Sequence, residues 1–309
     1  MIIASIDIGT NTVLMLIAET DKSNFRIKPI KNFYEIPRIG KGMIPNGEIP
    51  EDNIKRLIKT LNNYKVIIKN YNCEKFLVTG TNALRTANNS KLILDSIKKE
   101  TGFEVNVISG DEEAGLSFLG ATAEIPANKE CLVIDIGGGS TEIIYGRSSS
   151  IKFRKSFDAG VVSLTEKFIH HDPPLPEELI NIKNQITAKI KILYEKKFKP
   201  FASIAIAGTP TTLAAMKMNM QTYDEDLIEG SFLQTEEIKE LANRLSSLSV
   251  EEIKNKYSSI VEGREDLILT GSIMLLTIME MLGLKKVKVS SKGIRYGAIV
   301  KYYFKNSTD

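Results

Sequence analysis

The stretch CLVIDIGGGSTEII, residues 131–144, places an aspartate and three consecutive glycines at the end of an apolar run. Nearly the same pattern occurs near the start of the chain, in IIASIDIGTNTVLMLI, residues 2–17. Each stretch predicts two strands joined by a tight, glycine-containing turn. Asp7 and Asp135 lie about one domain length apart. The repeat therefore predicts one α/β unit that is present twice.

The rest of the chain alternates between strand-like and helix-like patterns. Short apolar runs predict strands at 75–80, 103–109 and 201–208. Apolar residues at helical spacing predict helices at 50–71, 90–102 and 176–197. Two more helices are predicted to begin with an S-x-x-E capping box, one at Ser163 and one at Ser249.

Charge and cysteine content exclude few classes of protein. The chain has 309 residues, of which 42% are hydrophobic and 26% charged, so it is long enough for two globular domains. A net charge of +3 allows an anionic substrate and does not require nucleic acid, so no nucleic-acid partner is expected. Cys73 and Cys131 show neither metal-type nor CxxC spacing. They predict a reduced, cytoplasmic protein.

Two other features have simple structural interpretations. Residues 267–284 form an apolar segment long enough to consider as a membrane span. The segment contains Glu280 and several small polar residues, so we interpret it as a buried core helix and expect no membrane association. His170 and His171 are the only histidines and precede DPPLP, so we interpret them as structural or solvated.

The two glycine turns suit phosphate binding. Glycine lets successive backbone N–H groups approach a phosphate because no Cβ intrudes. A tight hairpin is the simpler explanation of one such turn, whereas two copies, each after an aspartate, favour phosphate. Asp135 ends a buried strand, and a bound magnesium ion would offset the cost of its buried charge. Glu142 suits either a second metal ligand or a solvated strand residue. P-loop and Rossmann motifs are absent from the sequence.

The paired hairpins resemble the phosphate loops of the actin-like ATPase and sugar-kinase superfamily. The closer resemblance is to its exopolyphosphatase and guanosine pentaphosphate phosphatase (Ppx/GppA) branch. Nine segments carry it in order: IDIGTNTVLMLI, RIGKGM, GTNALRTANN, ISGDEEAGLSFLGA, LVIDIGGGSTEII, AGVVSLTEKF, IAGTPTTLAA, REDLILTGSIML and VSSKGIRYGAIV. The family's usual SDRG is SSKG here, at residues 290–293, and Tyr296 stands where an acidic residue is expected.

The resemblance implies the fold and the domains. We expect an α/β protein of two duplicated ribonuclease H-like domains with an active-site cleft between them, in the short, two-domain form of the family. Domain I would comprise residues 1–122 plus 298–309, and domain II residues 123–297. Closure on a ligand would bend the chain near residues 120–128 and around 298. A homodimer is compatible with this reading.

The resemblance also implies hydrolysis of a terminal phosphoryl group from inorganic polyphosphate or guanosine pentaphosphate, assisted by Mg²⁺ or another divalent cation. Glu113 is the implied base. Local pattern agrees, because Ser109 and Glu112 form an S-x-x-E capping box and Glu113 points about 100° away around the helix. The implied metal ligands are Asp135 and Glu142. The implied phosphate ligands are Thr10, Asn11, Thr12, Arg85, Gly137, Gly138, Gly139, Ser140, Thr141, Gly208 and Thr209.

Several alternatives stay open on the sequence alone. Arg85 suits a phosphate contact or a surface salt bridge, and Gly208 with Thr209 suits a phosphate turn or a plain helix start. Solvated positions are expected for Arg38, Lys41, Arg264 and the lysine-rich segment 183–199. For the whole protein, the alternatives are a non-catalytic sensor of polyphosphate or an alarmone nucleotide, and a kinase or ATPase of the same superfold.

Overall fold

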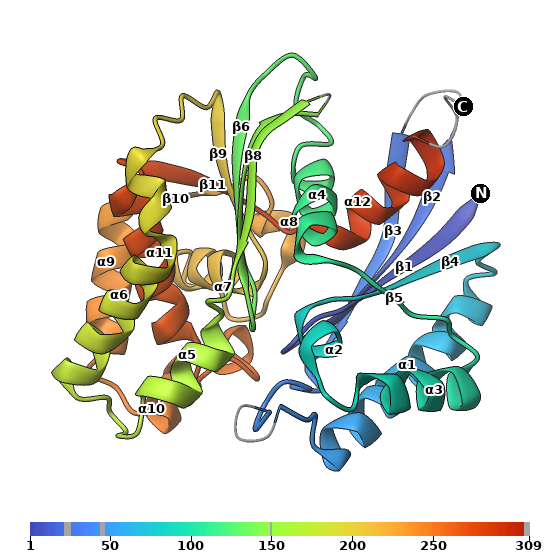
Figure 1. Cartoon of the computed structure of the whole chain (residues 1–309), viewed down its shortest axis with the longest axis horizontal. Coiled ribbons are helices and arrows are strands. Elements are labelled where there is room, and N and C mark those ends of the chain that lie inside the picture. The colour runs from blue at the N-terminus through green and yellow to red at the C-terminus, as the bar shows by residue number, and fades with distance from the viewer. Residues whose placement is uncertain (22–25, 44–46, 149, 306–309) are drawn as a thin grey trace. The chain divides into compact units, whose positions relative to one another are not determined.

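The computed structural model describes residues 1–21, 26–43, 47–148 and 150–305, and it forms two compact units (Figure 1). Unit 1 comprises residues 1–123 and the chain from Lys292 onward, and unit 2 comprises residues 124–291. The chain first passes from unit 1 to unit 2 after residue 123, one residue from the predicted boundary at 122. The second passage falls at Lys292 instead of residue 298, because helix α12 (Ile294–Val300) packs against α4 (Gly110–Ala121) of unit 1.

The sheet of unit 1 has the strand order β3-β2-β1-β4-β5. Its strands are β1 (Ile2–Ile8), β2 (Val13–Asp21), β3 (Arg26–Glu35), β4 (Lys75–Gly80) and β5 (Asn106–Val107). Strands β1, β2 and β3 form an antiparallel meander, whereas β4 is parallel to β1 and β5 is parallel to β4. The predicted strand at 103–109 is thus much shorter than expected, and β3 was not predicted.

Helices cover both faces of this sheet, which is why β1 is apolar almost throughout. They are α1 (Glu51–Asn70), α2 (Asn82–Thr86), α3 (Ser90–Thr101), α4, α12 and a π-helical turn (Lys301–Lys305). On one face Ile6 and Ile8 pack with Leu57 and Leu61 of α1. On the other face Ile3 packs with Ile299 of α12.

The sheet of unit 2 has the order β10-β11-β9-β6-β7-β8. Its strands are β6 (Cys131–Ile136), β7 (Thr141–Arg147), β8 (Ser150–Phe157), β9 (Ala202–Ile206), β10 (Phe232–Gln234) and β11 (Lys286–Ser290). Strands β6, β7 and β8 repeat the antiparallel meander, and β9 is parallel to β6 as β4 is to β1. The predicted duplication is therefore confirmed.

The helices of unit 2 differ from the predicted ones at their ends. They are α5 (Val161–Phe168), α6 (Pro176–Ile190), the 3₁₀ turn η1 (Lys191–Glu195), α7 (Gly208–Lys217), α8 (Glu225–Ile228), α9 (Thr235–Leu245), α10 (Val250–Tyr257), η2 (Ser258–Ile260) and α11 (Ile268–Met281). The helix predicted over 176–197 ends as an α-helix at Ile190. The Ser249 capping box is confirmed. The Ser163 box is wrong, because the cap of α5 lies three residues earlier, at Gly160, and Ser163 Oγ bonds back to Gly160.

The apolar segment 267–284 lies where we interpreted it, since α11 is buried within the core of unit 2. No helix in the described part of the chain is both long and apolar enough to cross a membrane. The histidine interpretation also holds: His171 Nδ1 lies 2.9 Å from Glu178 Oε1, and this hydrogen bond is the main reason that the pKa of Glu178 falls to about 2.

Candidate active site

The N-terminus of α4 separates the roles of two adjacent glutamates. The Ser109 side chain accepts from the Glu112 backbone N–H, and the Glu112 carboxylate accepts from the Ser109 backbone N–H, both at 3.2 Å. The predicted capping box is confirmed. The backbone hydrogen bond from Ser109 is the main cause that lowers the pKa of Glu112. Glu112 therefore stabilises the start of the helix.

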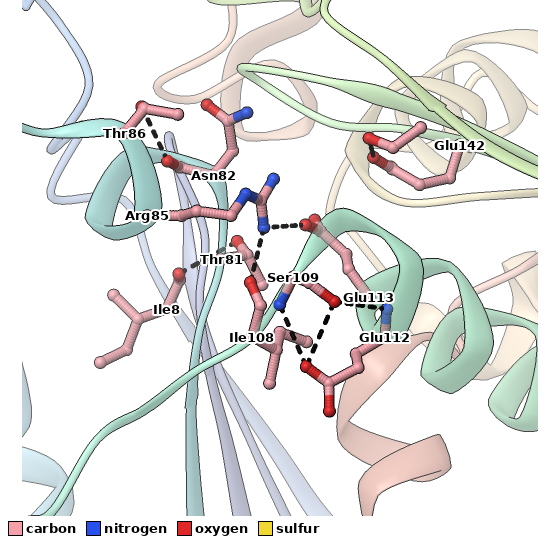
Figure 2. Close-up of polar contacts among 11 residues, drawn as sticks. Ile8, Thr81, Asn82, Arg85, Thr86, Ile108, Ser109, Glu112, Glu113 and Glu142 are labelled. Atoms are coloured by element: carbon pink, nitrogen blue, oxygen red, sulfur yellow. Dashed lines mark hydrogen bonds and ion pairs between the residues drawn. The ribbon is translucent and has the colours of Figure 1, made fainter.

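Glu113 points elsewhere and is buried, with 6% of the residue exposed. Figure 2 shows its carboxylate meeting the guanidinium of Arg85, which comes from α2. Arg85 Nη1 donates to Glu113 Oε2 at 2.8 Å and to the Ile108 carbonyl at 2.9 Å. The second bond ties Arg85 to the residue just before the cap of α4. Two elements of unit 1 thus hold the carboxylate in one place.

Close packing of α12 sets the position of α4. A Cβ on Gly297 would lie 1.9 Å from the Leu116 carbonyl oxygen, and one on Gly120 would lie 2.1 Å from the Gly293 carbonyl oxygen. Real Cβ atoms do not approach so closely, so glycine is needed at both crossings. The two helix backbones can then touch, so α4, which carries Glu113, is held rigidly against α12.

The glycine turn of unit 1 joins β1 to β2 and contains Thr10, Asn11 and Thr12. The Gly9 N–H donates to the Thr12 carbonyl at 3.0 Å. Backbone N–H groups in the segment 38–40 donate to the carbonyls of Thr10 at 2.9 Å and Asn11 at 3.0 Å. All three turn carbonyls thus accept bonds from within unit 1, which fixes the turn in one conformation.

The glycine turn of unit 2 repeats this construction. It contains Gly137, Gly138, Gly139, Ser140 and Thr141. The Gly137 N–H donates to the Ser140 carbonyl at 2.9 Å, the counterpart of the bond in unit 1. The first two N–H groups of α5 donate to the carbonyls of Gly137 at 3.1 Å and Gly138 at 2.8 Å. A Cβ on Gly160 would lie 2.3 Å from the Gly138 carbonyl oxygen, so this contact needs glycine.

One predicted phosphate donor is used differently in the structure. The Thr141 hydroxyl donates to the Ala159 carbonyl at 2.6 Å, and the residue is 1% exposed. This bond holds the segment before α5 against the turn. Because the hydroxyl has a single proton, it cannot also donate to a phosphate while this bond is intact.

Asp135 and Glu142 face each other across the β6–β7 hairpin. They are directly opposite in register, so their side chains leave the same face of the sheet. Both are buried, at 7% and 1% exposure, and Ser156 Oγ on β8 donates to Glu142 Oε1 at 2.6 Å. In unit 1 the same register pairs Asp7 with Leu14, so only the second hairpin has two facing carboxylates.

This carboxylate pair fits a divalent cation. Like charges directly across an antiparallel pair destabilise it, and a cation between them reverses the sign of that interaction. Hard oxygen ligands are what magnesium prefers, and magnesium commonly takes only one or two carboxylates. Among the residues described, no group of three or more histidine, cysteine, aspartate or glutamate side chains is placed to hold a metal.

The third predicted turn begins α7. Gly208 is its first residue, with Ala207 before it at φ 76°. A Cβ on Gly208 would lie 2.7 Å from Nε of Arg264, so that guanidinium lies against the helix start. The solvated position predicted for Arg264 is therefore wrong. The Thr209 side chain packs against Gly271 of α11, which makes Thr209 part of the contact between two helices.

The divergent SSKG segment has a partner distant in sequence, Glu229, that the sequence did not suggest. Glu229 accepts bonds from Ser290 Oγ at 2.9 Å, from Ser291 N at 2.7 Å and from Ser291 Oγ at 3.0 Å. An aspartate at position 291, as in the family's usual motif, would place a second carboxylate beside Glu229. Serine at this position is therefore matched to Glu229 in this chain.

The fold and these sites define the class of protein. Two units of similar topology, each with an antiparallel meander, a parallel strand and a glycine turn after a strand-borne aspartate, define a duplicated α/β protein. Residues 16–305 match the Ppx/GppA phosphatase family, and the chain belongs to that family. The predicted α/β fold of two duplicated domains is confirmed. The predicted enzyme class, a hydrolase of phosphoric anhydrides, is confirmed by the family and by relatives named exopolyphosphatase and guanosine-5'-triphosphate,3'-diphosphate pyrophosphatase.

Individual relatives show how much of the chain is shared. A bifunctional 3-dehydroquinate synthase/phosphatase of Fusobacterium nucleatum is 33% identical over 308 residues, which is 96% of this chain but 46% of that protein. Exopolyphosphatase 2 of Mycobacterium tuberculosis is 28% identical over 309 residues, 96% of each chain. The crystal structure of an exopolyphosphatase from Cytophaga hutchinsonii matches with a TM-score of 0.89 at 27% identity, over 98% of each chain.

Proposed function

We propose that this protein is an exopolyphosphatase-type hydrolase that releases terminal orthophosphate from inorganic polyphosphate or from guanosine pentaphosphate. The observation that carries the proposal is the buried Glu113 carboxylate held by Arg85, beside a glutamate that is occupied in a cap. A buried carboxylate at a helix start, next to the glutamate of the capping box and oriented by an arginine, is suited to positioning a water molecule. The names of the mycobacterial and Cytophaga relatives point to the same activity.

Glu113 would act on the attacking water. Its carboxylate accepts the water proton as the oxygen approaches phosphorus in line with the leaving phosphate. Glu113 is buried in the first turn of α4 and held by Arg85, so its carboxylate has a fixed direction. Orientation of the water then matters as much as proton removal. Arg85 supplies that orientation through its bonds to Glu113 and to the Ile108 carbonyl.

Asp135 and Glu142 would hold Mg²⁺, with Ser156 orienting Glu142 through its 2.6 Å bond. Bound magnesium neutralises charge on phosphoryl oxygens. The N–H groups of Gly9 and Gly137 donate within the turns, so the other backbone N–H groups of the two turns would bind further phosphate oxygens. Arg85, Ser140 and Gly208 remain predicted phosphate contacts within this scheme.

The test is phosphate release in the presence of Mg²⁺ from long-chain polyphosphate, tripolyphosphate, guanosine pentaphosphate and ATP, assayed side by side. We expect orthophosphate from polyphosphate or guanosine pentaphosphate, and loss of that activity with a chelator. Tight polyphosphate binding without phosphate release would support the sensor alternative and refute hydrolysis. Release from ATP alone would support the ATPase alternative.

A further inference from the structure

The edge strand β8 and the segment 196–199 form a basic surface on unit 2. The exposed side chains Lys152, Arg154 and Lys155 come from β8, and Lys197 and Lys199 come from the segment KKFK, together with the partly exposed Lys196. We call these six residues the β8 basic surface. Neither 145–157 nor 196–201 contains an aspartate or glutamate. Asp158 and Glu195 flank these segments, and Asp158 pairs with Lys189 at 3.2 Å, so the six cations outnumber the acidic residues beside them.

Aromatic packing holds the lysine segment against the strand. The Phe198 ring lies 4.7 Å from the Tyr145 ring and 5.4 Å from the Phe153 ring, measured between centroids. Lys196 Nζ lies 5.3 Å from the centroid of Phe153, and the Lys199 backbone N–H donates to Tyr145 Oη at 3.4 Å. The lysines are thus fixed beside β8 and are not on a free tail, although like charges repel one another there.

The neighbouring acid does not neutralise the surface. Glu130 accepts from Lys152, from Arg147 at 3.1 Å and from the Tyr145 hydroxyl. Its charge is therefore shared between two cations at one end of the surface. Within the described part of the chain, Glu130 forms ion pairs with Lys152 and Arg147 but not with Lys155 or the KKFK lysines. Lys155, Lys197 and Lys199 are exposed. A fixed cluster in which cations outnumber the nearby carboxylates favours a polyanionic ligand.

Strand β8 also connects this surface to the candidate metal ligands. Ser156 lies opposite Glu142 in register and bonds its carboxylate, and Arg154 leaves the sheet on the same face two residues away. Phe153 and Lys155 leave the sheet on the opposite face, where Phe198 packs, and β8 is the edge strand, so basic side chains stand on both faces along this edge. The rings of Tyr145, Phe153 and Phe198 pack against one another, whereas Tyr194 and Phe201 beside the segment are exposed, so single-stranded RNA is the competing ligand that the test must include.

We propose that the β8 basic surface is an accessory binding site for a linear inorganic polyphosphate chain, away from its reacting end. The choice of polyphosphate as the ligand rests on the proposed function, whereas binding of a linear polyanion does not. A long chain would contact the lysines of segment 196–199 and the basic residues of β8 together. The carboxylate pair and Phe198 lie on opposite faces of the sheet, so a chain must pass around the β8 edge to contact both. Long chains should therefore gain affinity from this surface and short chains should not.

The test removes three charges from the lysine segment. The triple variant Lys196→Gln, Lys197→Gln, Lys199→Gln leaves Phe198 and strand β8 in place. Its control converts three exposed lysines of α1 in unit 1, Lys59, Lys65 and Lys69, to glutamine. Binding of long-chain polyphosphate is measured with chelator present to stop turnover, over a series of salt concentrations. Orthophosphate release from tripolyphosphate is measured with Mg²⁺.

We expect the triple variant to bind long polyphosphate at least about tenfold more weakly, and to lower the slope of log affinity against log salt by roughly 2, since each lost contact removes about 0.7. Release from tripolyphosphate should stay within about twofold of the unsubstituted protein, a change too small to reflect loss of a phosphate contact. Equal binding by the triple variant and the α1 control would overturn the proposal. So would a single-stranded RNA that binds more tightly than polyphosphate and is lost in the same variant. If the unsubstituted protein releases no phosphate but the binding loss is seen, hydrolysis fails and the accessory site stands.

Discussion

Exchanging each of the adjacent glutamates of α4 for glutamine should separate catalysis from stability. Glutamine keeps the size of glutamate and one carbonyl oxygen, but it has no negative charge. In Glu113→Gln, that oxygen can still accept from Arg85, so the orientation is largely retained. The proton acceptor is lost. We expect turnover to fall roughly 10²- to 10⁴-fold, the usual size of a general-base contribution.

Stability should change in Glu113→Gln as well. Arg85 loses its counter-ion at a side chain that is 22% exposed, while the Ile108 carbonyl still accepts from it. A charge-assisted hydrogen bond contributes about 1.5–3 kcal/mol, and conversion to a neutral acceptor removes part of it. We therefore expect a loss of about 1–2 kcal/mol in the free energy of unfolding. The fold should persist and substrate binding should be retained.

Glu112→Gln should behave differently. Glutamine also serves at this position of a capping box, and the Glu112 side chain is 50% exposed. The main loss is a negative charge at the helix N-terminus, which is worth about 0.3–1 kcal/mol. Turnover should stay within a few fold of the unsubstituted protein.

The assay pairs urea unfolding with initial rates of phosphate release under saturating substrate. Circular dichroism of each variant checks that the helices are intact. A large loss of turnover in Glu112→Gln with little change in Glu113→Gln would refute both the division of roles at α4 and the assignment of the base.

Three further predictions concern other parts of the chain. Asp135→Asn should abolish magnesium-dependent phosphate release while leaving the melting temperature nearly unchanged; full activity would make Asp135 structural. Gly297→Ala should lower the free energy of unfolding in urea by about 3 kcal/mol or more, because the new Cβ would meet the Leu116 carbonyl at 1.9 Å and the helices must part. The pKa of Glu130 is lowered from 4.5 to about 2, chiefly by its hydrogen bond from Lys152. Its contribution to stability is therefore present above pH 4.5 and lost as pH falls toward 2, so Glu130→Gln should be less stable at neutral pH and match the unsubstituted protein near pH 2.

Local bonding explains what could be predicted from sequence. The capping boxes at Ser109 and Ser249 join residues three apart, so the pattern contains both partners of each bond. The glycine turns are similar, since the bonds Gly9 to Thr12 and Gly137 to Ser140 close within four residues. Repetition of that short pattern, with alternating strands and helices, was sufficient for the duplicated α/β fold.

The features that could not be predicted depend on bonds between segments that are distant in the sequence. Ser163 carries the same S-x-x-E pattern, yet α5 begins earlier because its first N–H groups bond to the glycine turn of 137–138. A local pattern cannot reveal that competing partner. The predicted return of the chain to the first domain at residue 298 differs from the observed return at Lys292 for a similar reason. Helix α12 belongs to unit 1 only through its close packing on α4.

The sequence by itself determined which residues have the side chains that the proposed chemistry needs. They are a glutamate next to the capping glutamate, two carboxylates on strands, and glycines whose backbone N–H groups are not covered by a Cβ. The tertiary structure alone decided how they are held. Arg85 meets Glu113 across 28 residues, and Ser156 meets Glu142 across 14 residues. These contacts depend on how helices and strands pack, and packing is set by the apolar side chains and glycines of the whole unit.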